Sequence, residues 1–312
     1  MDDSRPPTTV SVIIPTHNHA RFLGEALDSV LAQRFQDFEV VVVDDGSTDG
    51  TRALVASYAP RVRYHFQPHA GVSSARNAGL RYTSAPYVAF LDADDTWAPE
   101  KLSLQVACLD AHPRLGVVFT SYLKTDESGK PLMVEPKRFP YSRAPFETML
   151  VWPYGSMHVA MVRRACLARV GDFDETLTIA EDWDLWLRVA QRYCIANLDQ
   201  PLATYRQSAR SASRGPGRQE APAMFRRVVD KVFADPARLA GLPQTKVERL
   251  RRRAYGSLEI TTALMLLGPP WRHIACAARL SPAVLWLRRR ALVFLILQGL
   301  AGRFPAGEPR GF

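Results

Sequence analysis

Two of the most apolar runs in this chain end abruptly in carboxylates. The run FEVVVVDD (38–45) is apolar up to Asp44 and Asp45, and YVAFLDAD (87–94) is apolar up to Asp92. A run without apolar–polar alternation is typical of a strand that is covered on both faces of a sheet. Carboxylates next to such a strand lose hydration and repel one another, so their presence requires an explanation.

Segments with helical periodicity alternate with these runs. The pattern predicts further strands at 9–14, 62–67 and 115–123, and helices at 21–35, 73–83, 98–112 and 180–193, with another that begins at residue 164 and is ended by Gly171. Pro15 is expected to end the first strand. Strands that alternate with helices of this length predict an α/β fold with a mostly parallel central sheet and helices on both faces.

Polar residues follow three of the predicted strands. Ligands of such sheets bind beyond the carboxyl ends of the strands, so residues that follow neighbouring strands meet at one edge. The residues expected there are Pro15 and Thr16 after the first strand, Asp44 and Asp45 after the second, and Asp92 and Asp94 after the fourth. The sequence therefore predicts an acidic ligand site, although any one of these acids could also be a solvated turn residue.

The pair Asp92 and Asp94, separated by Ala93, fits a hard divalent cation. Mg²⁺ and Mn²⁺ take oxygen ligands and retain open positions that accept phosphate oxygens. The chain contains neither GxxxxGK[ST] nor GxGxxG, so the usual glycine-rich phosphate loops are absent from its sequence. A bound metal would explain why like charges are placed so close together.

Four blocks of the sequence together resemble a family 2 glycosyltransferase with the GT-A fold, over about residues 9–210. They are VSVIIPTHNHARFLGEALDSVLAQRFQDFEVVVVDDGSTDGT, GVSSARNAGL, FLDADDTW and GDFDETLTIAEDWDLWLRV. The resemblance implies an enzyme that transfers a sugar, with inversion, from a nucleoside diphosphate sugar to an acceptor hydroxyl. It also implies a divalent metal, Mn²⁺ or Mg²⁺, as the cofactor.

The resemblance implies roles for individual residues on the donor side. Asp92 would lie near the ribose and the metal, and Asp94 would bind the metal directly. Asp45, or its neighbour Asp44, would accept a hydrogen bond from the base. The remaining nucleotide-sugar contacts would come from Pro15, Thr16, Ala93 and Arg76. The alternative for Arg76 is an exposed helix arginine.

On the acceptor side, the resemblance implies that Asp182 is the catalytic base that takes the proton of the acceptor hydroxyl. Glu181, Trp183 and His158 would face the acceptor. Each of these three also has a structural interpretation: an acid at a helix start complements the helix dipole, a tryptophan at helical spacing packs in a core, and a histidine can be satisfied internally.

The C-terminal third differs in charge from the rest of the chain. Residues 214–312 carry 18 Lys+Arg and 6 Asp+Glu, whereas residues 1–213 carry 22 and 25. This shift predicts a catalytic domain over 1–213 and a basic helical extension over 214–312. Arginines 288–290 precede ALVFLIL (291–297), which is too short to span a bilayer but suits a helix in an anionic membrane interface. The alternative is that these helices pack on the catalytic domain. No nucleic-acid-binding motif accompanies the positive charge of residues 214–312, so a nucleic-acid partner is not expected.

The four cysteines form no CxxC pair and predict reduced thiols. The expected location is therefore cytoplasmic, peripheral on the inner face of the membrane. The acceptor would be a saccharide or a lipid-linked sugar, in the synthesis of a cell-surface polysaccharide or glycolipid. Two competing hypotheses are a non-catalytic module of the same fold that binds sugar nucleotides or polysaccharide, and a nucleotidyltransferase.

Overall fold

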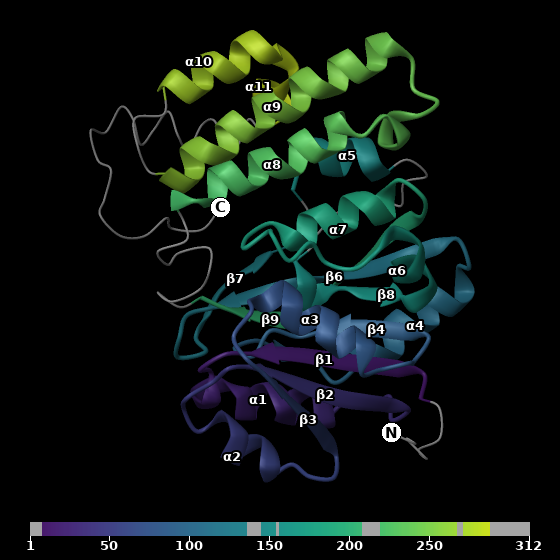
Figure 1. Ribbon diagram of the computed structural model, residues 1–312, viewed down its shortest axis with the longest axis vertical. Helices are drawn as coiled ribbons and strands as arrows, with labels where there is room; N and C mark the ends of the chain where they lie inside the picture. Colours follow the sequence, from purple (N-terminus) through teal and green to yellow (C-terminus); the bar gives the residue numbers. More distant parts are fainter. Residues whose placement is uncertain (1–7, 136–144, 154–155, 208–218, 267–270, 288–312) are drawn as a thin grey trace. The chain divides into compact units, whose positions relative to one another are not determined.

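The computed structural model describes residues 8–135, 145–153, 156–207, 219–266 and 271–287 (Figure 1). The chain forms two compact units. The first comprises Met1–Pro145 and Gly155–Gln207, and the second comprises Phe146–Tyr154 and Ser208–Phe312. The domain boundary predicted at residue 213 lies outside the described residues. The assignment of residues 146–154 to the second unit was not predicted.

The described part of the first unit forms a nine-stranded sheet in the order β3-β2-β1-β4-β8-β6-β9-β5, with β7 paired to β6. The strands β3, β2, β1 and β4 run parallel, as do β6 and β9, whereas β8 pairs antiparallel with β4 and β6. The strands are β1 Val10–Thr16, β2 Phe38–Asp45, β3 Val62–Gln67, β4 Tyr87–Phe90, β5 Thr96–Trp97, β6 Leu115–Thr125, β7 Pro131–Glu135, β8 Met161–Arg163 and β9 Cys194–Arg206.

Helices flank this mixed, mostly parallel sheet (Figure 1). They are α1 Ala20–Leu31, α2 Thr51–Ala56, α3 Val72–Arg81, α4 Lys101–Ala111, α6 Arg164–Val170 and α7 Glu181–Ala190, with a 3-10 helix at Met157–Val159. The predicted α/β class, with a parallel sheet at its centre, is confirmed.

The core explains how helix α3 is held against the sheet. Ala75 and Ala78 of α3 pack on Val41 and Val43 of β2. Gly79 lies so close to β1 that an added Cβ would be 2.4 Å from Cγ2 of Ile13. Small residues thus let the helix backbone approach the strands closely, and this packing fixes the position of the arginine that α3 carries at residue 76.

Two details of the strands differ from the expectations. Strand β1 continues through Pro15 to Thr16, because β4 pairs with β1 only as far as Ile13 and the missing N–H of Pro15 breaks no ladder on that side. The fourth strand ends at Phe90, so Asp92 and the acids after it lie in the loop between β4 and β5.

The second unit is helical in its described residues. It contains most of α5 Pro145–Val151, a 3-10 helix at Pro236–Leu239, and α8 Ala221–Ala234, α9 Gln244–Leu266, α10 Trp271–Leu280 and α11 Pro282–Leu287. A small core of Ile260, Ala263, Ala277 and Val284 joins α9, α10 and α11. In the described ranges we find no helix that is long and apolar enough to cross a bilayer. The segment 288–297, on which the membrane-interface prediction depends, lies outside them.

Candidate active site

Arg76 joins two distant segments at the edge of the sheet. Its guanidinium donates hydrogen bonds to Oδ1 of Asp92, at 2.8 Å, and to Oε1 of Glu181, at 2.6 Å. The side chain is only 4% exposed. Burial alone would lower the pKa of Arg76, but the two carboxylates raise it, so the guanidinium stays charged. The interpretation of Arg76 as an exposed helix arginine is therefore wrong: it connects the β4–β5 loop to the start of α7.

Asp182 lies next to Glu181 in the first turn of α7 and is half-buried. Its Oδ1 accepts the backbone N–H of Trp183 at 2.6 Å. Burial, followed by the negative charge of Glu181, raises the pKa of Asp182 to about 7, although Arg76 opposes the shift. A carboxylate with this pKa can exchange a proton near neutral pH, as a general base must.

The backbone before α7 has an unusual conformation. Ala180, the residue that precedes the helix, has φ 65° and ψ 18°. This left-handed conformation is unfavourable for a residue with a Cβ and is found mainly where surrounding structure enforces it. Here the conformation starts α7 so that Glu181 and Asp182 lie in its first turn.

The β4–β5 loop concentrates carboxylates. The N–H of Asp95 donates to the carbonyl of Asp92 at 3.0 Å, forming a tight turn. Burial and the charge of Asp92 raise the pKa of Asp94, and burial with the charges of Asp94 and Asp92 raises the pKa of Asp95 well above its usual value. Such shifts indicate a position where a cation would be bound favourably.

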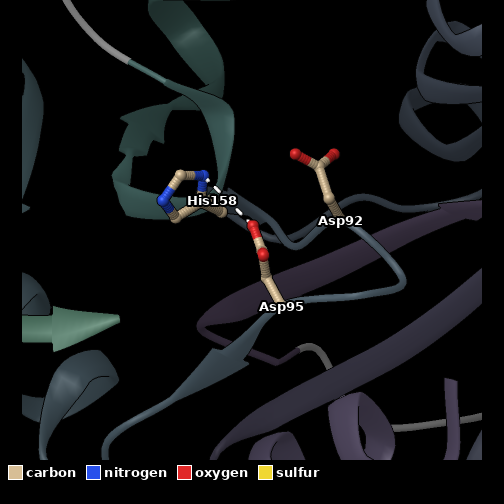
Figure 2. Close-up of side chains that lie close together, drawn as sticks. All are labelled: Asp92, Asp95 and His158. Atoms are coloured by element: carbon tan, nitrogen blue, oxygen red, sulfur yellow. Dashed lines mark ion pairs between the residues drawn. The ribbon is translucent and has the colours of Figure 1, made fainter. Parts of the chain in front are cut away.

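Asp92, Asp95 and His158 form a three-residue cluster whose potential ligand atoms lie within 4.8 Å of one another. Figure 2 shows the Asp95 carboxylate pointing at the ring of His158, with Asp92 beside them. Nδ1 of His158 lies 3.3 Å from Oδ2 of Asp95, and that oxygen is buried without a hydrogen-bond partner among the described residues. An imidazole and two carboxylates, one of which has an unsatisfied oxygen, fit a divalent metal.

This candidate metal cluster overlaps the predicted ligand pair Asp92 and Asp94 only in part. Asp92 belongs to the cluster, but the second carboxylate of the cluster is that of Asp95 and not that of Asp94. Asp94 is half-buried, and its backbone carbonyl accepts a hydrogen bond from Nε of Arg206 at 3.1 Å. The roles of Asp94 and of the neighbouring Ala93 remain predictions. Arg206 also donates its backbone N–H to Oδ1 of Asp95 at 2.9 Å, so the end of β9 fixes this loop.

The other acids of the predicted edge, Asp44 and Asp45, are the last two residues of β2. Asp44 accepts hydrogen bonds from the N–H of Ser47 and from the hydroxyl of Tyr64, and this bond, after burial, raises the pKa of Tyr64 to about 12. Asp45 accepts the N–H groups of Ala70 and Gly71. Both acids are thus structurally engaged, and their contact with a base remains a prediction.

The end of β1 also offers groups to a ligand. Oγ1 of Thr16 is buried without a hydrogen-bond partner in the part of the chain that the structure describes. The exposed ring of His69 pairs with Asp45 and lies 4.2 Å from the ring of His17, centroid to centroid. The pairing of these two histidines could not be predicted from the sequence, because nothing in the spacing of residues 17 and 69 links them.

Two candidates for the acceptor side lie in the interior. The Trp183 side chain is 2% exposed and presents no open ring face to an acceptor, which fits the core interpretation. His158 is 1% exposed and pairs with Asp95, so the structure places it in the candidate metal cluster. Glu181 lies beside Asp182 but is bound to Arg76.

The comparisons with known proteins identify the family and the fold. The model of glycosyl transferase family 2 matches residues 11–171. An uncharacterized glycosyltransferase of Rickettsia typhi is 32% identical over 192 residues, which cover 59% of this chain and 60% of that protein. The chain thus spans less than two thirds of the curated relatives it matches first.

Solved structures share the fold at low sequence identity. Residues 1–349 of TarS from S. aureus, in complex with UDP-GlcNAc, superpose with a TM-score of 0.65 at 19% identity, over 95% of this chain and 89% of that one. The mannosyltransferase PcManGT of Pyrobaculum calidifontis, in complex with GDP-Man and Mn²⁺, gives 0.55 at 23% identity, over 96% and 88%. The fold and the acidic edge define a glycosyltransferase of the GT-A type. The chain belongs to glycosyl transferase family 2.

Proposed function

We propose that the chain transfers a sugar, with inversion and with the help of a divalent metal, from a nucleoside diphosphate sugar to an acceptor hydroxyl. The observation that carries this proposal is the Arg76 bridge. It joins Asp92, in the candidate metal cluster, to Glu181, the neighbour of Asp182. The buried guanidinium of Arg76 thus links Asp92, proposed for the donor side, to the segment that carries Asp182, proposed for the acceptor side.

In this proposal Asp182 accepts the proton of the acceptor hydroxyl while the hydroxyl oxygen forms a bond with the anomeric carbon. The bond from that carbon to the diphosphate oxygen breaks, and the nucleoside diphosphate leaves from the opposite face. A pKa of about 7 leaves a large part of Asp182 deprotonated at neutral pH and makes it a sufficiently strong base.

Asp92, Asp95 and His158 would hold the metal, with Asp94 as a further candidate. A bound divalent cation would stabilise the charge that develops on the leaving diphosphate. The buried hydroxyl of Thr16 and the neighbouring Pro15 would line the nucleotide pocket, with Asp45 or Asp44 at the base. The complexes of TarS with UDP-GlcNAc and of PcManGT with GDP-Man support a nucleotide-sugar donor.

The acceptor is proposed only as a class: a hydroxyl of a saccharide or of a lipid-linked sugar, at the cytoplasmic face of the membrane. The excess of basic residues in 214–312 supports contact with an anionic surface. Flotation of the full chain with anionic and with neutral vesicles tests this part. Equal recovery with both vesicle types would contradict it.

The test of the reaction is the substitution Asp182→Asn, compared with Asp199→Asn, which changes an exposed carboxylate on β9. The Asp182 variant should bind nucleotide as the wild type does and lose nearly all transfer, because the amide cannot take the proton. The Asp199 variant should be unaffected. Transfer at the wild-type rate by the Asp182→Asn variant would show that Asp182 is not the catalytic base. Nucleotide binding without transfer in the wild type would favour a non-catalytic binding module.

A further inference from the structure

The short 3-10 helix that carries His158 is held from behind by a buried polar network. The indole N–H of Trp97 donates to the carbonyl of His158 at 2.8 Å. The amide nitrogen of Gln105 donates to the next carbonyl, that of Val159, at 3.0 Å and to the carbonyl of Val118 at 3.0 Å. Two side chains thus bind successive carbonyls of the segment that places His158 beside Asp95.

Lys101 connects these two side chains. Its Nζ lies 3.9 Å from the centroid of the Trp97 ring and donates to Oε1 of Gln105 at 2.7 Å. Because both amide hydrogens of Gln105 are directed at carbonyls, its oxygen is fixed toward the lysine. Lys101 therefore contacts both residues that bind the 3-10 helix.

The location of Lys101 is unfavourable in every other respect. It is fully buried, it is the first residue of α4, where a cation opposes the helix dipole, and no carboxylate pairs with it among the described residues. Burial lowers the pKa of Lys101 well below its usual value. An apolar side chain of the same length would cost less to bury, so stability alone does not explain a lysine at this position.

The ring of His158 is restrained as well. It stacks on Tyr205 with centroids 5.4 Å apart and makes an edge contact with Tyr122 at 5.1 Å. Residues that orient a metal-binding histidine through its surroundings affect metal affinity although they do not touch the metal. The hydrogen bond from Trp97 to the backbone of His158 and the aromatic contacts to its ring therefore both restrain the position of the imidazole.

We propose that Trp97 and Lys101 are positioning residues of the metal site, which hold the His158 segment so that the imidazole and the Asp95 carboxylate bind one divalent cation. This inference rests on the proposed function, because it requires the metal site. Trp97 is the last residue of the FLDADDTW block, whereas Lys101 lies outside all four blocks.

The test is Mn²⁺ binding by the full-length protein, measured by titration calorimetry and by the electron paramagnetic resonance signal of free Mn²⁺. Trp97→Phe keeps an aromatic ring but removes the N–H, and Lys101→Met keeps the length but removes the amine. Each should weaken Mn²⁺ binding about tenfold or more, the range found for residues behind metal ligands. Tyr87→Phe is the matched control, since it removes the hydroxyl of a buried aromatic residue, which donates to Asp110 and accepts from Arg163 away from the site. Its affinity should stay within about twofold of the wild type.

A double-substitution cycle separates positioning from a general loss of stability. His158→Gln should weaken Mn²⁺ binding by itself, and Trp97→Phe should add almost no further loss in that background. Additive losses, or an affinity of Trp97→Phe equal to that of Tyr87→Phe, would overturn the inference. If Lys101→Met fails to fold, the cycle of His158→Gln and Trp97→Phe still tests the inference. A wild-type protein that binds no Mn²⁺, with or without nucleoside diphosphate, would refute the metal part of the proposed function itself, which is a different result.

Discussion

Arg76→Met should destabilise the first unit strongly, and by an amount that depends on pH. Removal of one partner of a buried ion pair leaves an uncompensated charge and costs about 3–5 kcal/mol. The side chain of Glu181 is 12% exposed, but that of Asp92 is 32% exposed, so water screens part of the loss. We therefore expect a decrease in the free energy of unfolding of about 3 kcal/mol at pH 8.

The pH dependence follows from Asp182. Its folded pKa, about 7, lies above the value of an unfolded aspartate, so the folded state binds more protons and this group favours folding less as the pH rises. Arg76 lowers that pKa, and its removal raises it further. The deficit of Arg76→Met should thus be larger at pH 8 than at pH 5.5, because at pH 5.5 the Asp182 carboxyl is protonated in both folded proteins and adds nothing to the difference.

Hydrogen–deuterium exchange of the peptides that cover β1 and β2 measures this loss in the first unit alone. Arg81→Met, which changes the exposed arginine at the end of the same helix, is the matched control. In the Glu181→Gln background, the loss of unfolding free energy caused by Arg76→Met should be smaller by about 1 kcal/mol or more, because Glu181 then leaves no uncompensated buried charge. A deficit no larger than that of Arg81→Met, or one that is equal at both pH values, would refute the argument.

Further predictions concern the reaction and the packing around it. The rate of transfer at low substrate concentration should fall below about pH 7 as Asp182 becomes protonated, which a pH–rate profile measures; a rate that is flat down to pH 5 would contradict the base assignment. Chelation of divalent metal should abolish transfer and Mn²⁺ should restore it, whereas full activity in EDTA would exclude a required metal. Ala180→Gly should raise the free energy of unfolding by about 0.5–1 kcal/mol, because glycine adopts φ 65° without strain; urea denaturation that shows a loss would argue against strain at this residue. Gly79→Ala should lower it by about 1–3 kcal/mol, because the new Cβ meets Ile13, and an unchanged melting temperature would show that the core can adjust there.

Much of the fold follows from local sequence patterns. The bounds predicted for β2 and β3 agree with the structure. β2 contains four consecutive valines and β3 contains Val62, Tyr64 and Phe66, and β-branched and aromatic residues favour strands. The long strand β9 was not predicted, since Pro201 and the polar residues before it are typical of a loop. In the structure the register between β6 and β9 shifts next to Pro201, and this irregularity accommodates a residue without an N–H.

The candidate site was predictable only where its residues follow a strand or begin a helix. Asp92 and Asp182 are of this kind. The ion pair of Arg76 with Glu181, 105 residues apart, depends on how α7 packs, which no local periodicity encodes. The place of His158 beside Asp95 depends likewise on a three-residue 3-10 helix, whose position is set by contacts with Trp97 and Gln105.

The central claim is that the acidic edge of the sheet binds a nucleoside diphosphate together with a divalent metal. The most direct measurement is the melting temperature of the full chain with UDP, dTDP or GDP, each with and without Mn²⁺. A nucleotide at about 100 times its dissociation constant adds about 2.7 kcal/mol of stability, which corresponds to a rise of roughly 5–10 °C. The account predicts such a rise for one nucleotide, dependent on Mn²⁺ and lost in Asp92→Asn. The absence of any shift, with every nucleotide and with Mn²⁺ present, would contradict it.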